Sequence, residues 1–251
     1  MATLAVVGDD IAAVAPDGLP DTIPGVVRSA GERFGDAEAI VDGDVRLTFR
    51  QLAAEVEGSA RAFIHAGVEP GDRVALWAPN MVEWVVAALG AVSAGGVLVP
   101  VNTRFKGPEA AYVIGKARAT VLCCVNGFLG IDPLAMLRDT GADLPALQHV
   151  VVLHGDVPDG ARSWVEFLDA GGATPAEVAR ARAGGVRADY LSDICFTSGT
   201  TGRPKGVMMR HGPSVRVFRN LSAICGLAEG DRHLVVNPFF HTFGYKGGVL
   251  S

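Results

Sequence analysis

The arrangement of apolar runs along the chain constrains its fold more than any other feature. Residues 97–99 are continuously apolar, which is typical of a strand covered on both faces of a sheet. Segments with helix-forming composition separate such runs, and one begins with a capping box at Thr48 and Gln51. This order predicts an α/β fold with a doubly wound, mostly parallel sheet flanked by helices. We expect strands at 73–77, 97–101, 120–125, 149–153, 192–196, 206–211 and 232–237, and helices at 48–66, 82–94, 108–117, 174–182 and 213–227.

One stretch, residues 197–206, has the composition of a loop that holds phosphate. It reads Thr-Ser-Gly-Thr-Thr-Gly-Arg-Pro-Lys-Gly. Glycines let backbone N–H groups approach an anion, hydroxyls donate hydrogen bonds to phosphate oxygens, and Lys205 supplies the opposite charge. A flexible polar surface loop is the alternative. A generic P-loop ATPase is disfavoured, because Pro204 precedes the lysine and a strand rather than a helix is predicted to follow.

Residues 193–207 resemble the signature of the AMP-binding, adenylate-forming superfamily, which includes acyl-CoA synthetases, nonribosomal peptide adenylation domains and luciferases. Residues 237–244, Asn-Pro-Phe-Phe-His-Thr-Phe-Gly, resemble the next motif of that family. The resemblance implies that a carboxylate reacts with ATP, with magnesium bridging the phosphates, and that coenzyme A then takes the acyl group. Residues 239–248 are similar to a bacterial branch that activates the bicyclic propanoate left by steroid-nucleus breakdown. Fatty acids and aryl acids stay open as substrates.

The resemblance also implies roles for individual residues. It makes Lys205 a phosphate contact rather than the catalytic lysine of the superfamily. The residues assigned to the triphosphate of ATP are Thr197, Ser198, Gly199, Thr200, Thr201, Gly202 and Lys205. No residue of this chain is assigned as a metal ligand. Asn102-Thr103-Arg104 matches a sequence found at the equivalent strand end of acyl-CoA synthetases, and a turn with an Asx cap is the alternative.

His241 is the residue that the resemblance places beside the α-phosphate and the substrate carboxylate. It would orient the carboxylate or donate a hydrogen bond as charge develops; a core histidine with a satisfied partner is the alternative. We expect His241 to end an apolar strand. Phe243 and Gly244 are expected to shape the acyl pocket, with the glycine leaving room for a bulky group. Tyr245 and Lys246 have a second interpretation, as the start of a helix that faces solvent.

The chain is expected to divide into three parts. Residues 1–21 are an N-terminal extension, 22–190 a first α/β subdomain, and 191–251 the phosphate loop with the start of a second subdomain. The family also needs a Tyr-Gly-x-Thr-Glu block, an aspartate for the ribose and a small C-terminal domain, and we found none of these in the sequence. We therefore expect an N-terminal fragment that is inactive alone.

Composition and charge narrow the class of protein. The net charge is −5 and basic residues do not cluster, so we expect no nucleic-acid partner. Residues 84–103 carry no charge, but glycines and a proline interrupt them, which favours helix, turn and strand over a membrane span. The four cysteines form no Cys-x-x-Cys pair and the six histidines lack metal-ligand spacing, so we expect reduced thiols, a cytoplasmic enzyme and no zinc.

Two other functions stay open. The first is an adenylation domain that loads the thiol of a carrier protein, and the second is a non-catalytic nucleotide-binding module. The sequence does not determine the oligomeric state, and a homo-oligomer is one of the alternatives.

Overall fold

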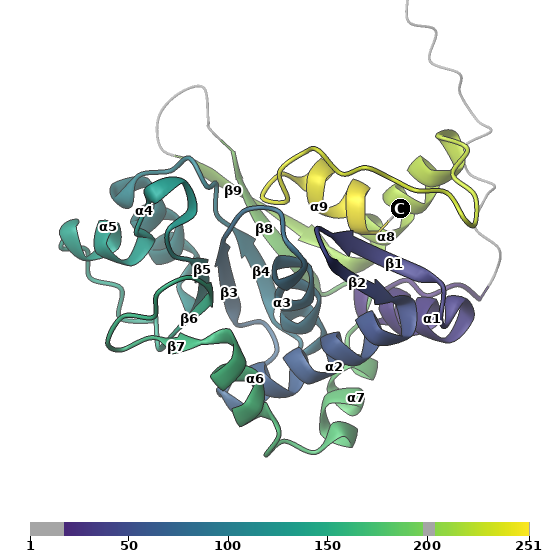
Figure 1. Cartoon of the computed structure of the whole chain (residues 1–251), viewed down its shortest axis with the longest axis horizontal. Coiled ribbons are helices and arrows are strands. Elements are labelled where there is room, and N and C mark those ends of the chain that lie inside the picture. The colour runs from purple at the N-terminus through teal and green to yellow at the C-terminus, as the bar shows by residue number, and fades with distance from the viewer. Residues whose placement is uncertain (1–17, 198–203, 251) are drawn as a thin grey trace, which may run out of the picture.

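The central element is a seven-stranded sheet with the strand order β7-β6-β5-β3-β4-β8-β9 (Figure 1). The computed structural model of the chain describes residues 18–197 and 204–250. Neighbouring strands are parallel except for β8 and β9, which are antiparallel. The predicted doubly wound, mostly parallel sheet is therefore confirmed. The strands are β3 (Arg73–Trp77), β4 (Val97–Pro100), β5 (Ala119–Val125), β6 (His149–His154), β7 (Arg162–Ser163), β8 (Leu191–Thr197) and β9 (Lys205–Arg210).

Side chains of the central strands alternate between two hydrophobic cores. In β3, Val74 and Leu76 belong to one core, while Ala75 and Trp77 belong to the other. Because helices cover both faces of the sheet, β4 is buried at every position. The helices that contribute to the first core are α1 (Ile23–Phe34), α2 (Phe49–His65), α3 (Val82–Ser93), α6 (Trp164–Gly171), α7 (Ala176–Gly184), α8 (His211–Ile224) and α9 (Thr242–Val249); those of the second are α4 (Gly107–Ala117) and α5 (Pro133–Asp139).

Local signals set the boundaries of α2. The Thr48 hydroxyl accepts a 3.2 Å hydrogen bond from the Gln51 amide, and the Gln51 side chain accepts one of 2.9 Å from the Thr48 amide. The predicted capping box is thus present. The helix ends at His65, and Gly67 follows with φ at +82°, a backbone conformation that favours glycine. Before α2 the chain forms an antiparallel hairpin that the sequence did not predict, made of β1 (Glu38–Asp42) and β2 (Val45–Thr48).

The uncharged stretch at 84–103 folds as expected into helix, turn and strand. It spans most of α3, a turn at residues 94–96 and all of β4. Helix α3 has 12 residues, and it is buried along almost its whole length between the sheet and α2. Within residues 18–197 and 204–250, no helix is both long and apolar enough to cross a membrane.

Two predictions near the C-terminal end of the chain are wrong. Residues 232–237 form no strand: the segment is irregular, and Leu234 and Val236 are 83% and 76% exposed. An apolar run makes a strand only when another strand pairs with it, and no described strand forms a ladder with this segment. Tyr245 and Lys246 do belong to a helix, α9, but they do not face solvent, because their side chains are 1% and 0% exposed.

Candidate functional site

The two ends of the predicted phosphate loop lie opposite one another. Strand β8 ends at Thr197, β9 begins at Lys205, and the two residues are partners in the antiparallel register. The Thr197 hydroxyl donates a 3.4 Å hydrogen bond to the Lys205 carbonyl, and both residues are exposed. The other predicted phosphate contacts, Ser198, Gly199, Thr200, Thr201 and Gly202, lie outside the described residues.

The base of this loop is braced by its neighbours. The Tyr112 hydroxyl of α4 donates a 3.3 Å hydrogen bond to the Pro204 carbonyl. A side chain at Gly206 would place its Cβ 2.8 Å from the side chain of Ile194 on β8, so only glycine fits there without a shift. The last glycine of the motif therefore serves the close packing of the two strands.

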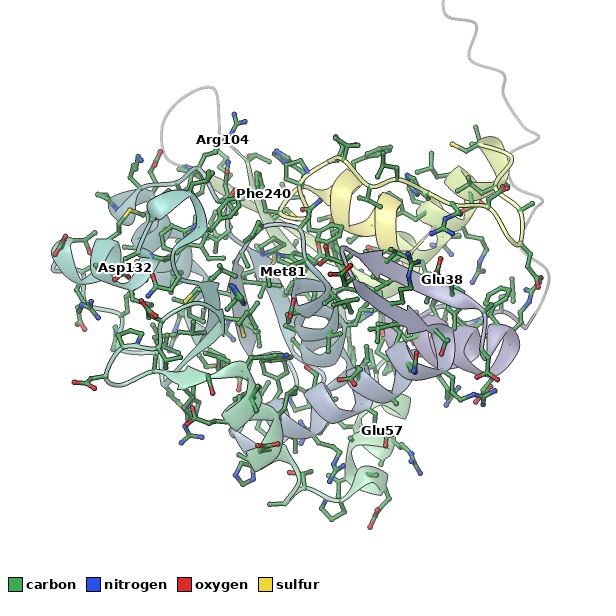
Figure 2. The ribbon with its side chains drawn as sticks, in the orientation of Figure 1. Glu38, Glu57, Met81, Arg104, Asp132 and Phe240 are labelled. Atoms are coloured by element: carbon green, nitrogen blue, oxygen red, sulfur yellow. The ribbon has the colours of Figure 1, made fainter. Side chains whose placement is uncertain are left out.

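A neighbouring strand end contributes a turn at the same edge of the sheet. Strands β4 and β8 are parallel neighbours, so their carboxyl ends lie together. After β4, the Asn102 side chain accepts a 2.9 Å hydrogen bond from the Arg104 amide, so the Asx-capped turn is observed. In Figure 2, Arg104 and Phe240 lie toward the same upper edge of the molecule. The side-chain oxygen of Asn102 therefore stabilises the turn that follows β4.

The second motif is anchored to the start of α3, a connection that the sequence did not predict. The Asn80 amide donates a 2.9 Å hydrogen bond to the Asn237 carbonyl, and its oxygen accepts one of 2.7 Å from the Phe239 amide. The Phe239 ring is buried with its centroid 5.0 Å from that of Trp84. An asparagine just before a helix was the only sequence signal, and it resembles an ordinary cap.

His241 is the N-cap residue of α9 rather than the end of a strand. Its backbone amide donates a 3.0 Å hydrogen bond to the Pro238 carbonyl, which closes a tight turn ahead of the helix. The imidazole is exposed and lies beside the Phe240 ring, with centroids 4.5 Å apart. An exposed ring is accessible to a ligand, which argues against the core-histidine alternative.

Phe243 and Gly244 take different positions after His241. The Phe243 side chain is 54% exposed, whereas Gly244 is buried. A Cβ at Gly244 would overlap the Pro238 carbonyl, so glycine is required by the backbone of its own segment. The space that we expected the glycine to leave for an acyl group is therefore filled by the turn before α9.

Behind α9 lies a buried polar cluster that the sequence did not predict. The Lys246 ammonium is 2.7 Å from an Asp193 carboxylate oxygen, and both side chains are 0% exposed. The ammonium also donates a 2.7 Å hydrogen bond to the Ser214 hydroxyl and lies 3.5 Å from the Met209 sulfur. The Ser192 hydroxyl donates to the same Asp193 oxygen at 2.6 Å. These contacts join β8, β9, α8 and α9.

Burial controls the charge of the groups around this ion pair. Burial, followed by the nearby Asp193 carboxylate, raises the pKa of the Cys195 thiol to about 12, so the thiol stays protonated. Burial likewise raises the pKa of the Tyr245 hydroxyl well above its usual range. For His211, burial lowers the pKa to about 4, and the neutral ring accepts a 3.3 Å hydrogen bond from the Ile23 amide. The side chains of Cys195, Tyr245 and His211 are therefore uncharged at neutral pH.

The described residues suit the phosphates of a nucleotide better than a metal ion. Thr197 and Lys205 present a hydroxyl and an ammonium at the base of the loop, and both can donate to anionic oxygens. Within the described ranges, no group of three His, Cys, Asp or Glu side chains could hold a metal.

Curated proteins with similar sequences match most of the chain. Over 234 residues the chain is 44% identical to a 3-[(3aS,4S,7aS)-7a-methyl-1,5-dioxo-octahydro-1H-inden-4-yl]propanoyl:CoA ligase of Rhodococcus jostii. The alignment covers 92% of this chain and 45% of the relative. A protein of the same name from Mycobacterium tuberculosis is 43% identical over 230 residues, covering 92% and 44%. The chain thus spans a little under half the length of these relatives.

Solved structures show the same fold. The anthranilate CoA ligase AuaEII, solved in complex with anthranoyl-AMP, superposes with a TM-score of 0.79 at 28% identity, over 93% of this chain and 43% of that one. The apo structure of MbtA from Mycobacterium smegmatis gives a TM-score of 0.78 at 26% identity, over 91% and 42%. The family model described as "AMP-binding enzyme" matches residues 27–251, nearly the whole chain. The chain therefore belongs to the AMP-binding enzyme family.

Proposed function

We propose that this chain is the ATP- and carboxylate-binding part of an acyl-CoA synthetase. One observation carries the proposal: the two motifs are joined by a hydrogen bond between β8 and α9. The Thr242 hydroxyl, next to His241, donates a 3.4 Å hydrogen bond to the Cys195 sulfur, and Cys195 lies on β8 shortly before Thr197. The residue assigned to the carboxylate is thereby tied to the strand that leads into the phosphate loop.

The chemistry proceeds in two steps. A carboxylate oxygen attacks the α-phosphorus of ATP, the bond from that phosphorus to pyrophosphate breaks, and acyl-AMP forms. The thiol sulfur of coenzyme A then bonds to the acyl carbon, the bond from that carbon to the AMP oxygen breaks, and the thiol proton is released as AMP leaves. The first step depends on positioning and charge stabilisation, because negative charge accumulates on the phosphate oxygens. Magnesium, when bound to the phosphates, neutralises part of that charge.

The residues of this chain have separate tasks in the first step. Lys205 donates hydrogen bonds to the phosphates, together with the proposed contacts Ser198, Gly199, Thr200, Thr201 and Gly202. The Thr197 hydroxyl joins them by turning from the Lys205 carbonyl to a phosphate oxygen. His241 orients the carboxylate from the exposed end of α9. Phe243, which is 54% exposed on the first turn of α9, contributes apolar surface to the acyl site, and Gly244 lets the turn before α9 pack closely against the helix.

The substrate we propose is a propanoate carried on a bicyclic ketone. Support comes from the two relatives at 44% and 43% identity, whose names specify a methyl-dioxo-octahydroindenyl propanoyl group. Coenzyme A as the thiol acceptor follows from the same names. A cytoplasmic location suits an enzyme that consumes ATP and coenzyme A, and the free thiols of Cys123 and Cys124 fit a reducing compartment.

The test uses the natural polypeptide purified from its source cells, whose intact mass is measured first. Pyrophosphate release is then followed with ATP, magnesium and three acids: the bicyclic propanoate, a medium-chain fatty acid and benzoate. We expect kcat/KM to be highest for the bicyclic propanoate, and we expect the 251-residue chain alone to make no acyl-CoA. Preference for another acid would change the substrate. ATP binding without pyrophosphate release from any acid would instead support a non-catalytic module, and transfer only to a carrier-protein thiol would support an adenylation domain.

A further inference from the structure

The ion pair between Lys246 and Asp193 connects the two halves of the candidate site. Asp193 lies on β8, shortly before the strand reaches Thr197, and Lys246 lies on α9, shortly after the helix begins behind His241. Their side chains meet at 2.7 Å with no exposure to solvent. The pair is therefore a direct bridge between the phosphate-loop strand and the helix that presents His241.

Stability alone does not explain a charged pair at this position. Removing two charges from water is unfavourable, and apolar pairs of similar volume are often at least as stable in protein interiors. The surrounding strands show that apolar side chains would suit this face, since Val74, Leu76 and Leu98 occupy it elsewhere in the sheet. An ion pair fixes the relative position of the two elements that carry it, because its hydrogen bonds are satisfied in only one arrangement.

The contacts of Lys246 allow a single register of α9. Each hydrogen of the ammonium has an acceptor within reach: Asp193 and Ser214 at 2.7 Å and the Met209 sulfur at 3.5 Å. A shift of the helix by one residue would bring Tyr245 or Gly247 to this place and leave the Asp193 carboxylate buried without its cation. Such a state is strongly unfavourable, so the helix cannot slide along the sheet.

We propose that Lys246 and Asp193 are positioning residues that fix His241 relative to the phosphate loop. The inference rests on the proposed acyl-CoA synthetase function, since it concerns the placing of the carboxylate against ATP. Neither residue touches the reacting atoms in this account. They act through α9 and β8, and the weaker contact between Thr242 and Cys195 supports the same alignment.

The main test is the double variant D193L/K246M in the natural polypeptide. It removes both charges and keeps approximate volume, so the fold is expected to survive, with a melting temperature close to that of the parent. We expect the kcat of pyrophosphate release to fall about ten- to hundred-fold, because small misplacements of reacting groups slow catalysis by such factors. The KM for ATP is expected to change much less. A purely structural role predicts an unaltered kcat for the folded enzyme, and a kcat within about two-fold of the parent overturns the proposal.

Two further variants keep the test decisive. S214A retains the ion pair and removes one hydrogen bond of the Lys246 ammonium, so it replaces D193L/K246M if that variant fails to fold. We expect S214A to have a lower kcat at an unchanged KM. A kcat equal to that of the parent would then overturn the proposal. The matched control is R187Q/D189N, which removes an exposed ion pair in the segment just before β8. We expect the control to match the parent in kcat, KM and melting temperature.

Failure of the proposed function would be recognised separately. If the parent protein releases no pyrophosphate with any acid, hydrogen–deuterium exchange of this chain replaces the kinetic measurement. We then expect amides at residues 242–249 to exchange faster in S214A and in D193L/K246M than in R187Q/D189N. Equal exchange in all three variants overturns the positioning role, whatever reaction the protein catalyses.

Discussion

Thr197 and Lys205 are direct partners across the antiparallel pair β8–β9, and the Thr197 hydroxyl donates a 3.4 Å hydrogen bond to the Lys205 carbonyl. The sheet is otherwise parallel, so this pair is where the chain reverses direction within it. Both ends of the phosphate loop are therefore held by one rigid element. Ends that are fixed before the ligand arrives lower the entropy cost of binding.

Replacing Lys205 is expected to weaken ATP use without unfolding the protein. The side chain is exposed, so Lys205→Ala should leave the melting temperature nearly unchanged. Loss of a charge-assisted contact should lower kcat/KM for ATP by about ten- to hundred-fold. Steady-state pyrophosphate release at varied ATP measures the effect. Lys116→Ala, an exposed lysine on α4, is the control, and equal behaviour of the two variants would contradict the assignment.

His241→Ala should slow adenylation far more than it weakens ATP binding. Because the imidazole is exposed at the N-cap of α9, its removal should leave the fold intact. We expect the rate of acyl-AMP formation to fall about 10²-fold or more, the range typical of a positioned acid, base or hydrogen-bond donor. Single-turnover measurements with saturating ATP give this rate. His233→Ala, at an exposed histidine in the irregular segment before the motif, should behave like the parent protein.

Gly244→Ala is expected to destabilise the fold. The new Cβ would overlap the Pro238 carbonyl, and forcing backbone apart in a packed site typically costs about 1–3 kcal/mol. Thermal or urea unfolding of the purified chain measures the change. Gly58→Ala in α2 is a matched control of opposite sign, since a Cβ there would have nothing within 4 Å and alanine favours helix. Equal stability of the two variants would show that the turn before α9 adjusts freely.

His211 should make the folded state sensitive to mild acid. Burial lowers its pKa from 6.5 to about 4, with Lys246 adding to this effect while Asp193 and Asp21 oppose it. The unfolded chain therefore binds the proton more readily, so stability is fully present above pH 6.5 and is lost as the pH falls toward 4. The loss from this group is roughly 3 kcal/mol.

Urea unfolding at several pH values tests the effect of His211. The variant His211→Gln keeps an acceptor for the Ile23 amide but does not titrate, so its free energy of unfolding should depend less on pH across this window. Identical slopes for the parent chain and the variant would assign the acid sensitivity to other groups.

Strands and helices of the sheet could be predicted closely because their signals are local. The apolar run at 74–77, preceded by Arg73, predicted β3 with its observed bounds, and the capping box at Thr48 placed the start of α2 correctly. The run at 232–237 has the same local character as a strand, but the structure gives it no partner among the described residues. Whether a segment pairs with another strand depends on the arrangement of the whole sheet, and the residue pattern of the segment alone does not determine it.

The candidate site was predictable in its motifs but not in its supports. The roles of the loop at 197–206 and of His241 are predictions from composition and resemblance. The burial of Lys246 was missed because lysine is rarely buried unless paired, and its partner, Asp193, lies on a distant part of the chain. Asn80 was missed for the same reason: its two partners lie at sequence separations of 157 and 159 residues.

The Asn80 bridge also bears on the order in which the chain folds. Contacts between residues so far apart in sequence require a large loop to close, so they form late compared with the pairing of β3 and β4 around α3. During synthesis, residues 237–239 leave the ribosome long after Asn80 does. The sheet and its first helices can therefore assemble before the second motif exists, and the His241 turn is added to a surface that is already in place.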